Sequence, residues 1–152
     1  MYGAFLLAAY NPHTEQYETI CNIGTGFSEA LLEELHKELT PLVIDRPKPF
    51  YSHSTVPKDQ PDVWFEPRLV WEVKAADLTL SPRYKAASEE FEGTSGEGKG
   101  VSLRFPRFIK PRPDKTPDQS TTTRAVAEMY RKQEAVAKEA KGKGGVDADF
   151  EY

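Results

Sequence analysis

The N-terminal part of the chain follows a β-strand pattern. Residues 2–10 are a near-continuous apolar run of strand length, and residues 16–23 alternate with period two. The positions that share one face of this second segment are Tyr17, Thr19, Cys21 and Ile23. Residues 11–13, Asn-Pro-His, have the composition of a turn. We therefore expect residues 2–23 to form a β-hairpin.

Residues 27–40 have helical spacing instead. Ser28 is a favourable N-cap residue, and Phe27 before it can pack against Leu32 as a hydrophobic staple. Leucines then recur at steps of three and four residues, at Leu31, Leu32, Leu35 and Leu39. Pro41 disfavours helical geometry at Thr40. We expect a helix that begins after Ser28 and ends near Thr40.

The rest of the chain predicts loops, short strands and a second helix. Residues 41–67 contain six prolines, which permit an extended loop and little else. Residues 69–80 return to strand character, and residues 101–112 predict one or two strands whose prolines confine them to bends or edges. Residues 88–100 predict a flexible acidic loop. Apolar residues at three- and four-residue steps predict a terminal helix over 121–138.

Short strands with two helices fit a mainly β (α+β) fold. The arrangement is typical of a small oligonucleotide-binding (OB) barrel with one internal helix and a C-terminal helix. A chain of 152 residues supports one core, and we assign residues 1–138 to a single OB domain. Residues 139–152 have few side chains to bury and predict a disordered tail.

The composition narrows the class of protein. The sequence has no run of 18 apolar residues, so we expect no membrane-spanning helix and no membrane partner. No basic region precedes the first apolar run, which argues against a signal peptide. Cys21 is the single cysteine, which fits a reducing compartment and a role as core filler. The three histidines lack the spacing of a metal site, and we assign no metal ligand.

The segment 101–115 carries the strongest functional signal. The chain has a net charge of −4, yet this segment is basic and carries two phenylalanines. Its cations are Arg104, Arg107, Lys110, Arg112 and Lys115, against the single carboxylate of Asp114. Concentrated cations on an acidic chain predict a surface that binds a polyanion, because local charge density governs such binding.

The order of residues in this segment carries a resemblance to a known family. Residues 102–108 read Ser-Leu-Arg-Phe-Pro-Arg-Phe, and Arg112-x-Asp114-Lys115 follows. This order closely resembles the last signature of the ATP-dependent DNA ligases, in particular the eukaryotic DNA ligase I type. Supporting matches lie in the same order at residues 2–10, 24–28, 70–73, 78–82 and 130–133. Together they cover roughly residues 2 to 133.

The resemblance implies a domain of a longer enzyme. Ligases of this family form a covalent lysyl-adenylate at a Lys-x-Asp-Gly motif, and no such tetrapeptide occurs in this sequence. In the family that motif lies in an upstream nucleotidyltransferase domain, and a smaller OB barrel follows it. The resemblance therefore implies a C-terminal OB domain that does not ligate by itself. It also implies ATP as cofactor, with Mg²⁺ bound mainly through the upstream domain.

The resemblance further implies partners and a location. The expected partners are nicked double-stranded DNA and the upstream nucleotidyltransferase domain of the same enzyme, which works as a monomer. The expected roles are replication, repair and recombination in the nucleus, with the mitochondrion as a second compartment. Two alternatives stay open: a non-catalytic OB module that binds single strands, and an RNA-capping or RNA-ligase relative, which the Arg-Phe-Pro-Arg-Phe stretch disfavours.

The resemblance also assigns roles to residues. Arg112 and Lys115 would close over the β and γ phosphates of ATP during adenylation, and Asp114 between them would orient these cations. Arg104, Phe105, Arg107 and Lys110 would face nicked DNA, with Phe105 as a wedge in the minor groove. The alternatives without a functional role are that the Arg-x-Asp-Lys residues are ordinary surface charges, and that Phe105 is a core aromatic that shares a strand face with Leu103.

Two further expectations concern the N-terminal half. The family's barrel begins with an apolar strand ahead of the segment matching residues 2–10. This sequence has no room for it, so we expect an exposed sheet edge and marginal stability, which a sharp cooperative melt above mesophilic temperatures would contradict. Residues 24–26, Gly-Thr-Gly, fit a tight strand-to-helix turn better than a phosphate cradle at the helix N-terminus.

Overall fold

A computed structural model of the chain describes residues 2–140, 150 and 151, with side chains described as far as residue 138. The disordered tail predicted at 139–152 falls mostly outside these residues. Its described parts are the last two residues of helix α2 (Thr123–Ala140) and the short strand β10 (Phe150–Glu151).

The predicted N-terminal hairpin is present. Strands β1 (Phe5–Asn11) and β2 (Gln16–Ile23) pair antiparallel, with a register shift between Leu7 and Ala8. Strand β4 (Tyr51–Ser52) adds to β2 in parallel, so β1 is the outer strand of this sheet among the described residues. On its outer side β1 forms an isolated bridge between Tyr10 and Thr122.

The remaining strands form three small sheets. In the first, β6 (Trp71–Ala75) lies between β9 (Arg107–Pro111) and β10, with both pairings antiparallel. In the second, β7 (Asp77–Ser81) pairs with β8 (Gly100–Arg104). The proline-rich segment contributes a third pair of two-residue strands, β3 (Val43–Ile44) and β5 (Trp64–Phe65). Short 3-10 turns occur at Thr40–Leu42, Pro57–Asp59, Ser88–Phe91 and Pro117–Gln119.

Both segments predicted as strands after residue 68 are divided by a bend. The first breaks at Ala76, whose amide donates to the carbonyl of Arg104 over 2.9 Å. The second breaks at Phe105 and Pro106, directly across from it. The chain therefore changes sheet twice at one corner, where β6 passes into β7 and β8 passes into β9.

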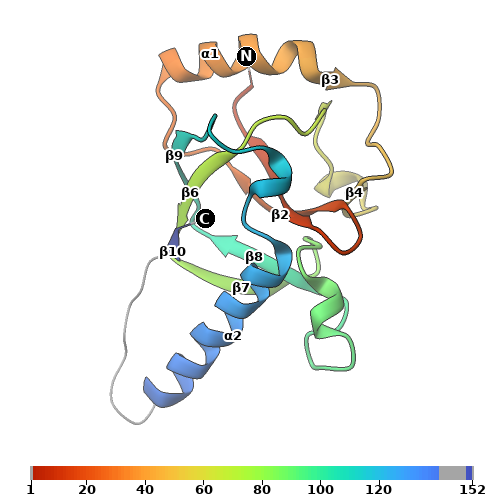
Figure 1. Cartoon of the computed structure of the whole chain (residues 1–152), viewed down its shortest axis with the longest axis vertical. Helices are drawn as coiled ribbons and strands as arrows, with labels where there is room; N and C mark the ends of the chain where they lie inside the picture. The colour runs from red at the N-terminus through yellow and green to blue at the C-terminus, as the bar shows by residue number, and fades with distance from the viewer. Residues whose placement is uncertain (1, 141–149, 152) are drawn as a thin grey trace.

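Two helices cover opposite ends of this β structure (Figure 1). Helix α1 (Glu29–Leu39) lies at one end and buries Leu35 and Leu39, and it ends before Pro41 as predicted. Helix α2 lies at the other end against β7 and β8. There the side-chain amide of Gln133 accepts from the Leu78 amide over 2.8 Å and donates to the Leu78 carbonyl over 2.7 Å. The mainly β fold with two helices is thus confirmed.

The core is aromatic where α1 meets the sheets. Trp71 contacts Phe5, Phe27 and Phe108 at ring-centroid distances of 5.0, 5.8 and 5.2 Å. Phe27 therefore packs into this cluster in addition to flanking the helix start. Cys21 is buried, as predicted, and burial raises the pKa of its thiol to about 12.

Both faces of β2 are buried, which the predicted alternation missed. Glu18 and Ile20 are 6 % and 5 % exposed, although they lie opposite the expected apolar face. The reason is that the segment after β7 packs on them. The carboxylate of Glu18 accepts a hydrogen bond from the Ala87 amide over 2.9 Å and one from the Asn11 side chain over 3.1 Å.

The prediction of a flexible loop over residues 88–100 is wrong for the first part of that segment. Its 3-10 turn buries Phe91, whose ring meets that of Tyr130 on α2 at 5.6 Å. Arg131 donates to the side chain and the carbonyl of Glu90 over 3.3 and 3.1 Å. Phe91 lies within an acidic stretch but packs on Tyr130, a residue far away in the sequence.

The cap of α1 gives a first stability prediction. The hydroxyl of Ser28 accepts a hydrogen bond from the Leu31 amide over 3.1 Å. Because this satisfies an otherwise unpaired helix donor, Ser28→Ala is expected to lower the free energy of unfolding by about 1 kcal/mol in urea titrations. Ser28→Asp should retain most of the stability, and an equal loss in both variants would contradict the capping role.

Glu18 gives a second prediction. Burial raises the pKa of its carboxyl above the ordinary 4.5, although the bonds from Ala87 and Asn11 lower it, and the charge of Glu89 adds to the rise. A raised folded-state pKa means that the folded protein holds the proton more tightly than the unfolded chain. This contribution to stability is full below pH 4.5 and is lost as pH rises through the folded-state pKa.

The Glu18 prediction is tested by unfolding in urea at a series of pH values. Glu18→Gln cannot ionise, so its stability should fall less than that of the parent as pH rises from 4 toward neutrality, a window set by the raised pKa. The difference between the two proteins is the measured quantity. Parallel curves would show that the carboxyl does not carry the effect.

Candidate functional site

The corner between β8 and β9 exposes an aromatic side chain. Phe105 has a φ of 50° and is 74 % exposed, whereas Leu103 on the preceding strand is 5 % exposed. A left-handed residue interrupts the period-two alternation of a strand, so the two side chains do not share a face. The alternative that Phe105 is a core aromatic is therefore wrong.

Two arginines flank this aromatic ring. The guanidinium of Arg104 lies over the Phe105 ring at 5.2 Å, and its Nε forms an ion pair with Asp77 at 3.0 Å. Arg107 is exposed and begins β9. Lys110 lies near the other end of β9, opposite Glu72. Of the four predicted DNA-facing residues, the fold thus gathers three at the corner and places Lys110 farther along.

The loop after β9 holds the Arg-x-Asp-Lys residues. The Arg112 amide donates to the Val70 carbonyl over 2.7 Å, which fixes the start of the loop beside β6. The Lys115 amide donates to the Arg112 carbonyl over 3.2 Å, closing a turn. Asp114 and Lys115 are exposed, and Arg112 is partly buried.

Two carboxylates hold the guanidinium of Arg112. Its Nε and Nη2 donate to the two oxygens of Asp114 over 3.0 and 2.9 Å, and Nη1 donates to Glu72 over 3.2 Å. The hydrogen bond from Arg112 is the main reason that the pKa of Asp114 lies at about 2, and the same bond raises the pKa of Arg112. Arg112 is thus oriented as a charged fork.

Sequence reasoning missed two residues of this site. Glu72 pairs with Arg112, and Asp77 pairs with Arg104, each across neighbouring strands. Glu72 lies within a segment that matches the family and Asp77 directly precedes another, but nothing in the spacing of these carboxylates shows which cation each one meets. Lys115, Arg107 and Lys110 form no ion pair within the part of the chain that the structure describes, and their charges face solvent.

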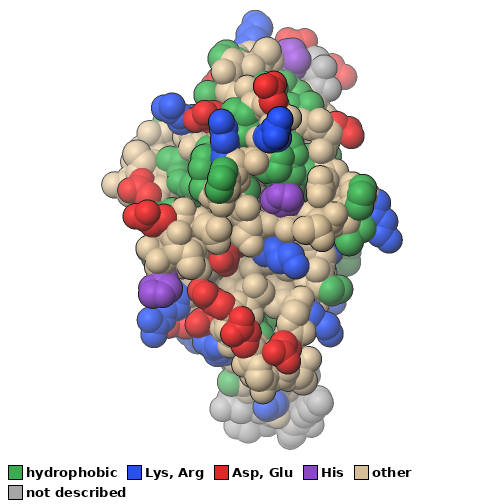
Figure 2. Space-filling model, turned by 90° about the vertical axis from the view of Figure 1, so that its right-hand side faces the viewer, with side chains coloured by type: hydrophobic (Ala, Val, Ile, Leu, Met, Phe, Trp, Pro, Cys, Tyr) green, Lys and Arg blue, Asp and Glu red, His purple; other side chains and the backbone are tan. Residues whose placement is uncertain are grey.

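The opposite side of the molecule has a different character. Figure 2 shows the side that carries β4 and lies away from β9 in Figure 1. Apolar side chains gather on its upper half, acidic side chains occur on both halves, and basic side chains are scattered. This side therefore shows no gathering of basic side chains among the described residues, unlike the basic segment of residues 101–115 in the sequence.

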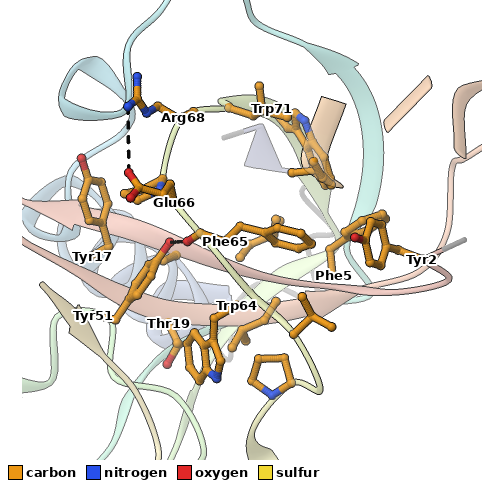
Figure 3. A pocket seen from close by; sticks show the side chains of 18 of the residues that line it. Tyr2, Phe5, Tyr17, Thr19, Tyr51, Trp64, Phe65, Glu66, Arg68 and Trp71 are labelled. Atoms are coloured by element: carbon orange, nitrogen blue, oxygen red, sulfur yellow. Dashed lines mark hydrogen bonds and ion pairs between the residues drawn. The ribbon is translucent and has the colours of Figure 1, made fainter. Parts of the chain in front are cut away.

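A cavity beside the N-terminal strand does not contain the predicted site residues. It has a volume of about 510 Å³ and is lined mainly by residues 2–8 and 61–71. Its walls are aromatic (Figure 3), and the Tyr51 hydroxyl donates to the Phe65 carbonyl over 2.6 Å. None of the seven residues predicted to contact ATP or DNA lines it.

The described residues offer no cluster of three or more His, Cys, Asp or Glu side chains that could hold a metal ion. Among them there is also no helix with the length and apolar character needed to cross a membrane. The groups that the corner and the loop present are several cations and an exposed aromatic ring. This set of groups suits the phosphates and stacked bases of nucleic acid.

Comparison with known proteins decides the family. A family model described as "ATP dependent DNA ligase C terminal region" matches residues 1–115, which end at Lys115. The chain belongs to the ATP-dependent DNA ligases. The matched part of this ligase chain includes the corner at Phe105 and the whole Arg-x-Asp-Lys loop, and the resemblance read from the sequence is confirmed.

Individual DNA ligases match this chain beyond residue 115. The chain is 53 % identical over 152 residues to DNA ligase 1 of Schizosaccharomyces pombe, covering 100 % of this chain and 19 % of that protein. It is 48 % identical over 133 residues to DNA ligase 1 of Arabidopsis thaliana, covering 88 % of this chain and 16 % of that one. A DNA ligase of Acidianus ambivalens is 42 % identical over 132 residues, which are 87 % of this chain and 20 % of the relative. The chain thus spans about a fifth or less of the length of these relatives.

Proposed function

We propose that this chain acts as the C-terminal OB domain of an ATP-dependent DNA ligase that seals nicks in duplex DNA. The observation that carries the proposal is the arrangement of β9. This strand begins directly after the corner that exposes Phe105 between two arginines, and it ends at the Arg-x-Asp-Lys loop. One short strand therefore connects a surface suited to DNA with cations suited to ATP phosphates.

In the first step the proposed role falls to Arg112 and Lys115. Transfer of AMP to a lysine of a nucleotidyltransferase domain expels pyrophosphate. This leaving group must be held in line with the attacking lysine, and its developing negative charge must be neutralised. The Arg112 fork and the exposed Lys115 ammonium fit phosphate oxygens by their chemistry. Arg112 would exchange its bonds to Asp114 and Glu72 for bonds to phosphate, and Asp114 would hold it ready between turnovers.

In the later steps, the binding and sealing of nicked DNA, the proposed role falls to the corner at Phe105. An exposed phenyl ring can press into the minor groove beside a nick, and the unstacking of bases is offset by the surface that it contacts. Arg104 and Arg107 on either side would bind the flanking phosphates, and Lys110 would bind phosphate farther along β9. Adenylation and sealing would then use different ends of the same strand.

Further parts of the proposal rest on the family. ATP is the proposed adenylate donor. Mg²⁺ is proposed to be bound mainly through a nucleotidyltransferase domain, as the resemblance to the family implies. We propose that the ligase works as a monomer in the nucleus on nicked DNA.

The proposed function is tested in a chimera. This chain replaces the matching 152 residues of DNA ligase 1 of Schizosaccharomyces pombe, to which it is 53 % identical. The chimera is expected to form the lysyl-adenylate and to seal a nicked duplex, while the same relative without this region should do neither efficiently. A folded chimera that binds single strands but does not restore adenylation would favour the alternative of a non-catalytic binding module.

A further inference from the structure

The loop between β2 and α1 packs against the corner that carries Phe105. The hydroxyl of Thr25 donates to the Pro106 carbonyl over 2.9 Å, and the Thr25 carbonyl accepts from the Phe108 amide over 3.0 Å. A residue of this loop thus bonds to both sides of Arg107, although the two segments are 81 positions apart. The loop therefore lies beside the first residues of β9 and bonds to them as a neighbouring strand would.

The next residue of the loop has no room for a side chain. Gly26 has a φ of 94°, and a Cβ atom there would lie 2.4 Å from the Phe108 carbonyl oxygen. Phe27 then stacks on Phe108 with ring centroids 4.6 Å apart and an interplanar angle of 25°. The backbone of β9 and that of the loop are therefore in direct contact.

Phe105 needs such support because its own conformation is unfavourable. A left-handed backbone is unfavourable for a residue other than glycine and persists where the surroundings impose it. On the N-terminal side, the Ala76 amide binds the Arg104 carbonyl over 2.9 Å. On the C-terminal side, the hydroxyl of Thr25 binds the Pro106 carbonyl. The peptide groups before and after Phe105–Pro106 are thus both held.

We propose that Thr25 is a positioning residue for nick recognition, which acts by holding Phe105 in its exposed, left-handed conformation. This inference rests on the proposed function, and the ligand of the positioned ring is the minor groove of nicked duplex DNA. Thr25 acts through the Pro106 carbonyl and not through ATP phosphates, because the Arg-x-Asp-Lys loop lies at the other end of β9.

The test compares Thr25→Val with Thr25→Ser in the chimera with DNA ligase 1 of Schizosaccharomyces pombe. Valine keeps the shape of threonine and removes the hydroxyl, whereas serine keeps the hydroxyl. Thr25→Val is expected to slow sealing of a pre-adenylated nick about three- to tenfold, the range for loss of one hydrogen bond. Lysyl-adenylate formation should stay unchanged, and Thr25→Ser should seal at close to the parent rate.

A double-mutant cycle with Phe105→Ala separates positioning from a direct DNA contact. If Thr25 acts through the phenyl ring, Thr25→Val should have no further effect once the ring is removed. An equal slowing in both backgrounds would overturn the proposal, because Thr25 would then act independently of Phe105. Slower adenylation in Thr25→Val would also overturn it, because the effect would reach beyond nick recognition.

Hydrogen exchange of the chimera gives a readout that does not depend on activity. A peptide that spans residues 104–108 should exchange faster in Thr25→Val than in the parent or Thr25→Ser, because the turn loses one of its two anchors. Unchanged exchange would overturn the positioning role. If exchange rises while Phe105→Ala seals normally, the loop holds the ring as inferred, and the proposed use of the ring on DNA is what fails.

Discussion

Arg112→Ala is expected to slow lysyl-adenylate formation about 10²- to 10³-fold in the chimera, the loss typical of removing one donor that stabilises a transition-state charge. The alanine variant has no group that can reach the departing phosphates from this position. The neighbouring carboxylates, Glu72 and Asp114, would also remain without their cation and would repel pyrophosphate. Both consequences act on the same step.

The step that is affected can be isolated. A nicked duplex that already carries AMP on its 5′ end bypasses adenylation of the enzyme, so Arg112→Ala should seal it at close to the parent rate. Arg112→Lys should fall between alanine and the parent, because lysine retains the charge and loses the bidentate fork. Arg68→Ala is the matched control. Arg68 is a largely exposed arginine that forms a long ion pair of 3.9 Å with Glu66, and its loss should leave adenylation unchanged.

The contrary results are distinct. Normal adenylation by Arg112→Ala would show that its pairing with Glu72 and Asp114 is structural. A large loss of sealing on the pre-adenylated nick would instead place Arg112 on the DNA. Quenched-flow measurement of adenylate formation and of nick closure, each as a single turnover, distinguishes these cases from a slow product release.

Phe105→Ala is expected to slow sealing of the pre-adenylated nick about 10- to 100-fold. The estimate follows from the 1 to 3 kcal/mol that contact between an aromatic side chain and a base is worth, at about tenfold for each 1.4 kcal/mol. The stability of the domain should change by less than about 0.5 kcal/mol, because the ring is 74 % exposed and leaves no cavity when removed. Adenylation should be unaffected.

Two variants sharpen this test. Phe105→Leu keeps an apolar wedge of smaller area and should recover part of the rate. Ile109→Ala removes an apolar side chain that is 42 % exposed on the same strand, and it should leave sealing unchanged. If Phe105→Ala and Ile109→Ala behave alike, exposed apolar surface on β9 has no specific role at the nick.

The sequence predicted the parts of this protein that depend on near neighbours. The hairpin of residues 5–23, the start of α1 after Ser28 and its end before Pro41 agree with the structure, because alternation, caps and prolines act within a few residues. The family was also readable from the sequence, since its signature is a contiguous order of side chains at Arg104, Phe105 and Arg107.

Residues that lie far apart in the sequence and meet in space were decided by the tertiary structure. Glu18 is buried by a segment that includes Ala87, 69 positions later, and the 3-10 turn at Phe91 packs on α2. A period-two pattern describes one strand and contains no information on what covers its second face. Alternation alone left open that Phe105 shares the buried face of Leu103, and only the left-handed turn in the folded chain excludes this alternative.

The same reason explains the site. The sequence identified Arg112, Asp114 and Lys115 as a group because they are contiguous. It gave no sign of Glu72 as the second carboxylate on Arg112, or of Thr25 as the support of Pro106, because these contacts span 40 and 81 positions. Which cations are held and which are free depends on the path of the chain through the sheets, and that path is a property of the folded molecule.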